Sequence, residues 1–136
     1  MGIPQVIVLD THVWIWFVSD PGKLSRKAKE AVEKAAAERL ALISSMSVWE
    51  AALLVLKGRL ELRMDFRDWL AKCEALPQFQ FVPIDNAIAA KSAFLPAPMH
   101  PDPADRIIAA TALTIGVPLV TKDERLLSYK ELKTIW

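Results

Sequence analysis

Four short apolar runs, separated by segments with helical patterns, constrain the fold of this chain most strongly. The first is Val6–Leu9, in which three of the four residues are β-branched, and the others are Leu40–Ile43, Phe79–Val82 and Leu119–Thr121. Runs this short and apolar are typical of strands buried on both faces of a parallel sheet. Because they alternate with helices, we predict an α/β domain with a parallel sheet, right-handed crossovers and helices on both faces.

The segments between these runs carry helix signals. The predicted helices are Thr11–Val18, Ser25–Arg39, the serine-led segment from Ser44 to about Leu56, Asp65–Ala75, Asp85–Phe94, Ala104–Ile115 and a short turn from Asp123. Ser25 is a suitable N-cap, and Gly58 and Gly116 are suitable stop signals. The proline-rich segment Leu95–Pro103 is predicted to be a loop, and Lys133–Ile135 a final extended segment.

Composition limits the class of protein. The 136 residues suit one domain spanning 1–136, and a chain that is 53% hydrophobic and 24% charged is globular. The net charge of +1 excludes a global positive field for duplex binding, so contact with nucleic acid must be local. The single cysteine, Cys73, indicates a reducing compartment, hence a cytoplasmic location. No segment approaches the roughly 20 apolar residues of a membrane span, so we expect no membrane association.

Four acidic residues follow the predicted strands or begin the helices next to them. Asp10 comes directly after the first strand, and Asp123 comes shortly after the fourth. Glu50 lies in the first turns of the helix after the second strand, and Asp105 begins the helix that leads to the fourth. A helix that leads back into a parallel strand starts at the carboxyl edge of the sheet. We therefore expect all four acids at that edge, where such sheets bind ligands.

Each acid also has a purely structural explanation. Asp10 and Asp123 could each cap the helix that follows. The pattern Ser47-x-x-Glu50 matches a capping box. Asp102, three residues before Asp105, is the better N-cap of its helix. The negative charge of Asp105 then interacts favourably with the helix dipole.

Convergence of the four acids weakens these separate explanations. Two unit charges about 4 Å apart cost on the order of 4 kcal/mol at an effective dielectric near 20. A hard divalent cation relieves that repulsion, and a donor set of oxygens alone favours Mg²⁺ or Mn²⁺. Such a cation lowers the pKa of a bound water and neutralises charge on phosphate oxygens. The sequence therefore predicts metal-dependent hydrolysis of a phosphodiester.

Four segments of this chain resemble the PIN-domain ribonucleases. They are VLDTHV at 8–13, SVWE at 47–50, HPDPADRIIAATA at 100–112 and VTKDER at 120–125. Within that family they look most like VapC, the toxin of bacterial and archaeal VapBC toxin–antitoxin pairs. The match covers nearly the whole chain, in order and with the family's spacing.

The resemblance implies a three-layer α/β/α sandwich around a parallel sheet of about five strands. It also implies cleavage of RNA that depends on Mg²⁺ or Mn²⁺, a homodimer, and inhibition by a cognate VapB-like antitoxin peptide. The family's catalytic and metal-binding acids fall on Asp10, Glu50, Asp105 and Asp123. Thr121 matches a hydroxyl that is frequent beside the fourth acid.

Other polar side chains near the predicted site receive auxiliary roles. Thr11 is one candidate, and Arg106 is another. Arg106 could contact a phosphate, although pairing with a nearby acid is favoured because carboxylates are abundant there. His12 and His100 could help with protons, but a metal mechanism needs no histidine.

The tryptophans are assigned by position. Trp49 is next to Glu50 and points to a different helix face, so we expect it in the core. Trp14 and Trp16 lie in a short helix near the first acid and are candidates for a dimer or antitoxin surface.

Three alternatives stand beside the nuclease. An aspartate-nucleophile phosphatase needs a second acid two residues after the first, where this chain has His12. A receiver domain needs an aspartate after the third strand, where Pro83 follows and Asp85 is poorly placed. A catalytically inactive RNA- or protein-binding module on the same fold is the third alternative.

Overall fold

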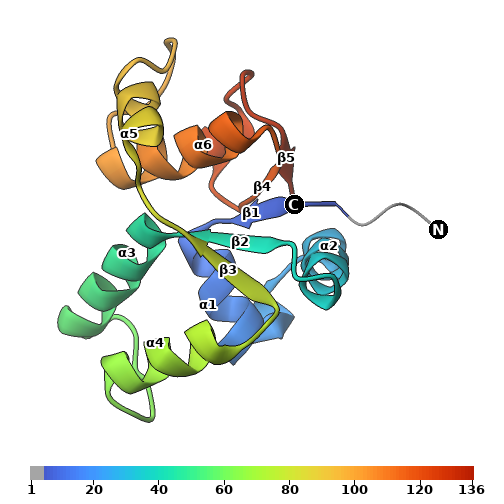
Figure 1. The fold of residues 1–136 in the computed structure, drawn as a ribbon, viewed down its shortest axis with the longest axis vertical. Coiled ribbons are helices and arrows are strands. Elements are labelled where there is room, and N and C mark those ends of the chain that lie inside the picture. Colours follow the sequence, from blue (N-terminus) through green and yellow to red (C-terminus); the bar gives the residue numbers. More distant parts are fainter. Residues whose placement is uncertain (1–4) are drawn as a thin grey trace.

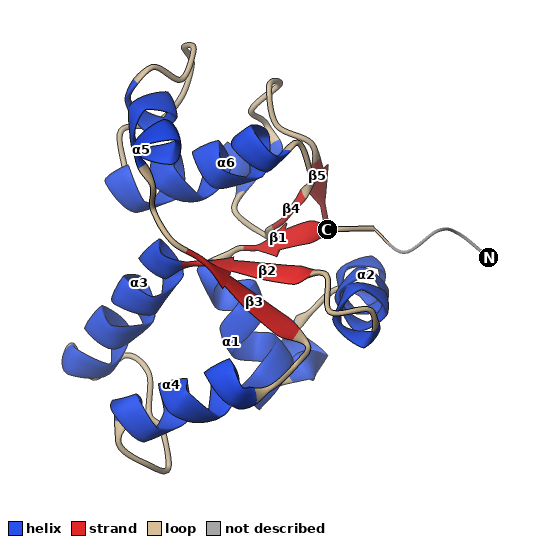
Figure 2. Ribbon diagram, viewed as in Figure 1, coloured by secondary structure: helices blue, strands red, loops and turns tan. Residues whose placement is uncertain are grey.

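The protein, in a computed structural model that describes residues 5–136, contains a five-stranded parallel sheet with helices on both faces (Figures 1 and 2). The strands are β1 (Ile7–Leu9), β2 (Ala41–Ser44), β3 (Phe79–Val82), β4 (Leu119–Val120) and β5 (Thr134–Ile135). They lie in the order β3-β2-β1-β4-β5, and every neighbouring pair is parallel. The predicted α/β/α sandwich is confirmed, and the final extended segment forms the fifth strand.

The helices lie close to their predicted positions. They are α1 (Thr11–Ser19), α2 (Arg26–Ala37), α3 (Ser45–Leu56), α4 (Phe66–Ala75), α5 (Asn86–Ala93), α6 (Pro103–Ile115) and α7 (Glu124–Leu127), with a 3₁₀ turn at Pro21–Lys23. Ser25 caps α2 by accepting from the backbone N–H of Ala28, and Gly116 ends α6 at φ +82°, as predicted. None of the helices within residues 5–136 has the length and apolar character that a membrane span requires.

The alternation of side chains along β1 divides the core into two layers. Ile7 and Leu9 pack with residues of α1, α2, α3 and α4 on one face of the sheet. Val8 points to the other face, where it packs with Ile108 and Ala112 of α6 and with the segment around α7. Because both faces are covered, the open position of this sheet is the edge formed by the carboxyl ends of its strands.

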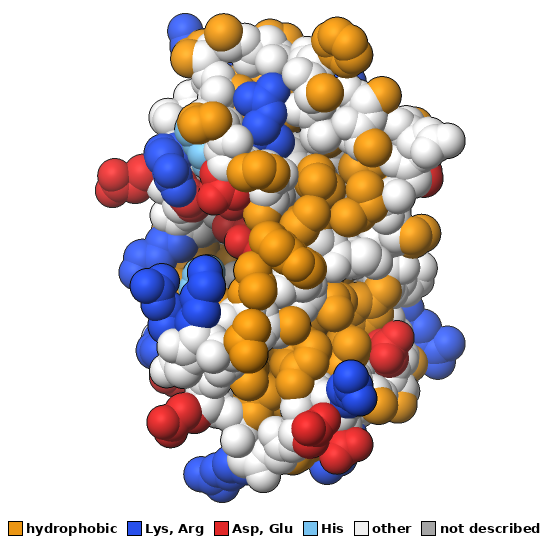
Figure 3. Space-filling model, turned by 90° about the vertical axis from the view of Figure 1, so that its left-hand side faces the viewer, with side chains coloured by type: hydrophobic (Ala, Val, Ile, Leu, Met, Phe, Trp, Pro, Cys, Tyr) orange, Lys and Arg blue, Asp and Glu red, His pale blue; other side chains and the backbone are white. Residues whose placement is uncertain are grey.

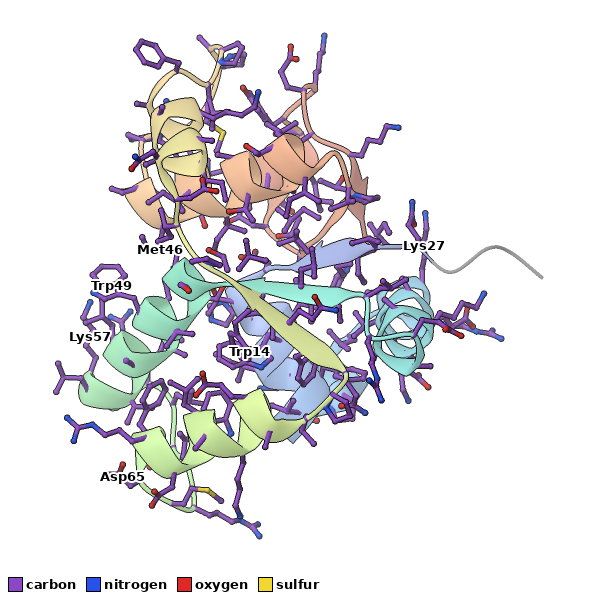
Figure 4. The ribbon with its side chains drawn as sticks, viewed as in Figure 1. Trp14, Lys27, Met46, Trp49, Lys57 and Asp65 are labelled. Atoms are coloured by element: carbon purple, nitrogen blue, oxygen red, sulfur yellow. The ribbon has the colours of Figure 1, made fainter. Side chains whose placement is uncertain are left out.

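Two tryptophan predictions are wrong. Trp14 is fully buried between the sheet and α4, with its ring 5.0 Å from that of Trp69, so it cannot form a partner surface (Figure 4). Trp49 points away from the molecule on α3 and is 56% exposed, because the buried face of that helix is narrow and carries small residues, Ser47 and Ala51. Trp16 is half-buried against Trp136.

Candidate active site

Asp10 stands at the carboxyl end of β1, where its side chain is fixed by two hydrogen bonds. Oδ1 accepts from the backbone N–H of Thr11 at 2.9 Å, and Oδ2 accepts from the hydroxyl of Thr121 at 2.7 Å. Thr121 is fully buried, and its hydroxyl also accepts from the backbone N–H of Asp123 at 3.0 Å. Burial raises the pKa of Asp10, although the hydrogen bond from Thr121 lowers it in part.

Glu50 enters the same region from α3 and is held by a second threonine. Oε1 of Glu50 lies 2.6 Å from the hydroxyl of Thr11, which in turn lies 2.9 Å from the hydroxyl of Ser47. An ionised carboxylate can only accept, so the single hydroxyl hydrogen of Thr11 goes to Glu50 and the oxygen of Thr11 accepts from Ser47. The pKa of Glu50 is raised by burial and then by the charge of Asp10.

This arrangement overturns the capping-box explanation of Glu50. The N-cap of α3 is Ser44, whose hydroxyl accepts from the backbone N–H of Met46 at 3.0 Å. Ser47 therefore lies inside α3 and does not cap it. Its buried hydroxyl forms a hydrogen bond with Thr11 instead. The first turn of α3 begins three residues earlier than a capping box at Ser47 would require.

Asp105 is a largely buried carboxylate whose pKa is raised far above its usual value. It lies in the first turn of α6 and is only 8% exposed. Its pKa is raised to about 7, first by burial and then by the charges of Asp10, Asp102 and Glu50, with a smaller contribution from Asp123. As predicted, Asp102 is the N-cap of this helix and accepts from the backbone N–H groups of Ala104 and Asp105, which leaves the Asp105 side chain free of a capping role.

Asp123 has a different environment because it has a cationic partner. It caps α7 by accepting from the backbone N–H of Arg125 at 2.8 Å, and its Oδ2 lies 3.2 Å from Nη2 of the same arginine. Burial alone would raise the pKa of Asp123, but the hydrogen bonds and charge of Arg125 lower it below its usual value. The same Nη2 atom is 3.7 Å from Oδ2 of Asp105.

All four predicted acids line one cleft of about 670 Å³ at the carboxyl edge of the sheet. Basic side chains line the same cleft, and Figure 3 shows carboxylates on this side of the molecule with basic groups above and below them. The basic residues that line the cleft are Arg59, Lys122 and Arg125, and His12 joins them. The cleft therefore combines an anionic floor with a cationic rim.

The donor set of this cleft fits a hard divalent cation. Within residues 5–136, no three His, Cys, Asp or Glu side chains stand close enough together to enclose an ion directly. Mg²⁺ does not need such a cage, because proteins bind it through one or two carboxylates and leave several waters in place. Burial, and then the charges of neighbouring acids, raise the pKa of Asp105, so a cation bound there would stabilise its ionised form.

Arg106 does not belong to the cleft, and its predicted pairing with an acid is wrong. Its guanidinium donates to backbone carbonyls of the proline-rich loop and the end of α5, at Ser92, Ala93 and His100. Arg106 thus fastens the loop before α6. His100 lies near the site as expected, with Nε2 3.4 Å from Oδ2 of Asp105.

Two residues that contact the site residues had no such role in the sequence-based prediction. Ser47 was interpreted as a cap, and only its burial beside Thr11 reveals that it supports the threonine. Arg125 follows Asp123 by two positions, a spacing that predicts no contact on a helix face. Its approach to Asp105, twenty positions away, depends on the fold and has no signal in the sequence.

Comparison with known proteins identifies the family. A model of the PIN domain matches residues 7–132. Ribonuclease VapC22 of Mycobacterium tuberculosis is 36% identical to this chain over 132 residues, which covers 96% of this chain and 98% of that protein.

Solved structures share the same architecture. FitAcB from Neisseria gonorrhoeae has a TM-score of 0.64 at 25% identity, with 94% of this chain and 95% of that chain covered. DNA-bound VapBC from Salmonella typhimurium has a TM-score of 0.68 at 18% identity, with 96% of each chain covered, and shows the shared fold. The chain therefore belongs to the PIN-domain family, and it resembles that family's VapC ribonucleases along nearly its whole length.

Proposed function

We propose that this chain is an endoribonuclease that requires Mg²⁺ or Mn²⁺ and acts as the toxin of a toxin–antitoxin pair. The observation that carries the proposal is the convergence of four acids in one cleft, with Asp105 buried among like charges. Carboxylates that repel one another at a ligand-binding edge are costly unless a cation joins them. The 36% identity to a protein named as a ribonuclease supports RNA as the substrate.

The residues that would hold the cation, one or two of them directly and the others through bound waters, are Asp10, Glu50, Asp105 and Asp123. When bound, Mg²⁺ or Mn²⁺ would lower the pKa of a water and neutralise charge on the phosphate oxygens. Thr121 fixes Asp10, and so aims one oxygen of that carboxylate before any ligand arrives. Partners of this kind orient ligating groups, and their loss typically costs 10- to 100-fold in activity or metal affinity.

Single-stranded or looped RNA fits the rim of the cleft. Arg59 and Lys122 supply the local positive charge that the net charge of the whole chain lacks. Lys122 lies over the rings of Trp16 and Trp136, with Nζ 5.8 and 6.0 Å from their centroids. Aromatic rings beside cations are typical of surfaces that bind unpaired nucleotides.

Cleavage of a labelled single-stranded RNA in defined metal tests this proposal. We expect cleavage in Mg²⁺ or Mn²⁺, complete loss in EDTA, and recovery when the metal is restored. Asp10→Asn protein, purified in the same way, controls for contaminating nucleases. Undiminished cleavage with metal verified absent would contradict the metal requirement, and RNA binding without cleavage in either metal would favour the inactive binding module.

A groove beside the cleft supports the antitoxin as a partner. It has a volume of about 540 Å³ and is lined by apolar residues that include Met46, Trp49, Leu53 and Ile84. Figure 3 shows the hydrophobic side chains of this side of the molecule as a continuous band next to the carboxylates. The groove shares its lining with the acidic cleft at Thr11, His12, Glu50, Arg59 and Asp102.

This continuity suits one extended partner segment with two kinds of side chain. Apolar residues would occupy the groove, and an arginine would reach the carboxylates as a bidentate pair. We expect Trp49→Ser to weaken capture of the antitoxin when the two proteins are co-expressed. Phe94→Ser removes an aromatic residue that is more exposed, at 84% against 56%, and that lies outside the groove, so it should leave capture unchanged. Equal capture by both variants would place the partner elsewhere.

A homodimer is part of the same proposal. The apolar fraction of 53% supports it, together with exposed apolar side chains such as Leu56 and the hydrophobic band of Figure 3. Molar mass in solution, measured at micromolar concentration by light scattering, decides between one copy and two. A strictly monomeric chain would contradict the dimer and leave the nuclease proposal in place.

A further inference from the structure

Arg125 stands among the carboxylates of the cleft, although no motif assigns it there. Its side chain is 60% exposed, and its Nη2 lies 3.2 Å from Oδ2 of Asp123 and 3.7 Å from Oδ2 of Asp105. Its Nε lies 3.4 Å from Oδ1 of Asp123. One guanidinium thus approaches two of the four acids that would hold a metal ion.

We propose that Arg125 is a built-in counter-ion of the acidic cleft, which a divalent cation displaces from Asp105 and Asp123 and which then binds a phosphate of the RNA. This inference rests on the proposed function. It gives one side chain two successive partners, a carboxylate pair and then a substrate phosphate. Both are planar or branched oxygen groups that a guanidinium binds in a bidentate manner.

The contacts of Arg125 would allow its guanidinium to move away from Asp105 and Asp123 without disturbing the fold. Its backbone N–H is fixed by the side chain of Asp123 at 2.8 Å, so the start of α7 does not depend on the guanidinium. The guanidinium itself is mostly exposed, and exposed ion pairs are individually weak. A divalent cation concentrates twice the charge on the same oxygens and would displace it.

The charges in the cleft show why a cation would still be favoured with Arg125 present. Nη2 of Arg125 is within hydrogen-bond distance of Asp123, at 3.2 Å, but lies 3.7 Å from the buried carboxylate of Asp105, which shares the cleft with Asp10, Glu50 and Asp102. The arginine therefore neutralises one member of the pair and leaves the other with excess negative charge. A second positive group is needed at Asp105.

The other basic residues of the cleft differ from Arg125 in their contacts with acids. Neither Arg59 nor Lys122 forms an ion pair with an acid among residues 5–136, and Lys122 rests on Trp16 and Trp136 instead. Lys122→Ala therefore removes the same charge from the same cleft without breaking a contact to a carboxylate. It is the matched control for general electrostatic effects on cation binding.

Binding of Mn²⁺ alone to the full chain, measured by titration calorimetry without RNA, tests the first half of the proposal. We expect Arg125→Ala to lower the Kd for Mn²⁺ about three- to tenfold, and Lys122→Ala to lower it less than twofold. Arg125→Lys keeps the charge and should stay within about twofold of the wild type. An Arg125→Ala variant that binds Mn²⁺ no more tightly than Lys122→Ala does would overturn the counter-ion role. Thermal melting confirms that each variant is folded.

Steady-state cleavage at saturating Mn²⁺ tests the second half. We expect both Arg125→Ala and Arg125→Lys to lower kcat/KM at least tenfold, because lysine lacks the planar fork that pairs with a phosphate. An unchanged kcat/KM in Arg125→Ala would overturn the phosphate role. If the wild type binds Mn²⁺ but cleaves no RNA, the proposed function fails, while the Mn²⁺ comparison still decides whether Arg125 is the counter-ion.

Discussion

The four predicted acids of the cleft fall into two pairs that are held by different means. Asp10 and Glu50 each accept a hydrogen bond from a buried threonine hydroxyl, at 2.7 and 2.6 Å. Asp105 and Asp123 instead face the exposed guanidinium of Arg125. A hydroxyl is neutral, so it fixes the direction of a carboxylate and leaves its charge, whereas an arginine compensates the charge and can swing away.

The difference separates orientation from charge balance within one site. The threonine-held pair, Asp10 and Glu50, is aimed before any ligand binds. In the arginine-facing pair, the negative charges are compensated unequally. The pKa of Asp105 is raised to about 7, whereas the pKa of Asp123 is lowered. Variants that remove a carboxylate charge or a threonine hydroxyl should therefore lower RNA cleavage by different amounts. Variants that remove repulsion between acids should change thermal stability.

Neutralising one acid should have the largest effect. We expect Asp10→Asn, Glu50→Gln and Asp105→Asn each to lower RNA cleavage in Mn²⁺ by more than about a hundredfold, because losing a mere partner of a metal ligand already costs 10- to 100-fold. Asp85→Asn is the matched control, since Asp85 caps α5 and does not line the cleft, and asparagine caps a helix as well as aspartate does. Full activity in Asp10→Asn or Asp105→Asn would end their catalytic assignment.

Removing a threonine hydroxyl should have a smaller effect. We expect Thr121→Val and Thr11→Val to lower cleavage about 10- to 100-fold, because each carboxylate keeps its charge and loses its orientation. Thr121→Ser retains the hydroxyl and should recover most of the activity. Thr111→Val, which removes a buried hydroxyl that donates to the carbonyl of Ile107 within α6, controls for the loss of any buried hydrogen bond. An equal loss in Thr111→Val would show that orientation of the carboxylates is not the cause.

The sequence predicts where all four acids lie, because their positions follow from the order of strands and helices. The apolar runs and helix signals place Asp10, Glu50, Asp105 and Asp123 at one sheet edge, because topology alone determines which end of a strand or helix faces the ligand. The same reasoning finds Asp102 as an N-cap, since capping depends on residues only two or three positions away.

Contacts across the fold are what the sequence could not predict. The bond between Thr121 and Asp10 spans 111 positions, and the pairing of Ser47 with Thr11 spans 36. Trp49 was expected in the core because it is large and apolar, yet it faces outward since small residues fill the buried face of α3. Arg106 was expected at an acid, but its guanidinium donates to backbone carbonyls at the end of α5 instead.

Stability in EDTA should show the smallest effect and the sharpest contrast between Asp105 and Asp123. At pH 8, above the value of about 7 to which the pKa of Asp105 is raised, that side chain is ionised, buried and repelled by its neighbours. Asp105→Asn removes the repulsion and should raise the free energy of unfolding by about 1 kcal/mol after solvent screening, or about 4 °C in Tm. Asp123→Asn removes a charge that Arg125 already balances, so it should lower stability by less than about 1 kcal/mol, while asparagine preserves the cap on α7.

Opposite signs of the two Tm shifts in EDTA would support unequal charge balance in the cleft. Equal destabilisation by both variants would mean that repulsion among the acids does not strain the protein, which removes the electrostatic argument for a bound cation.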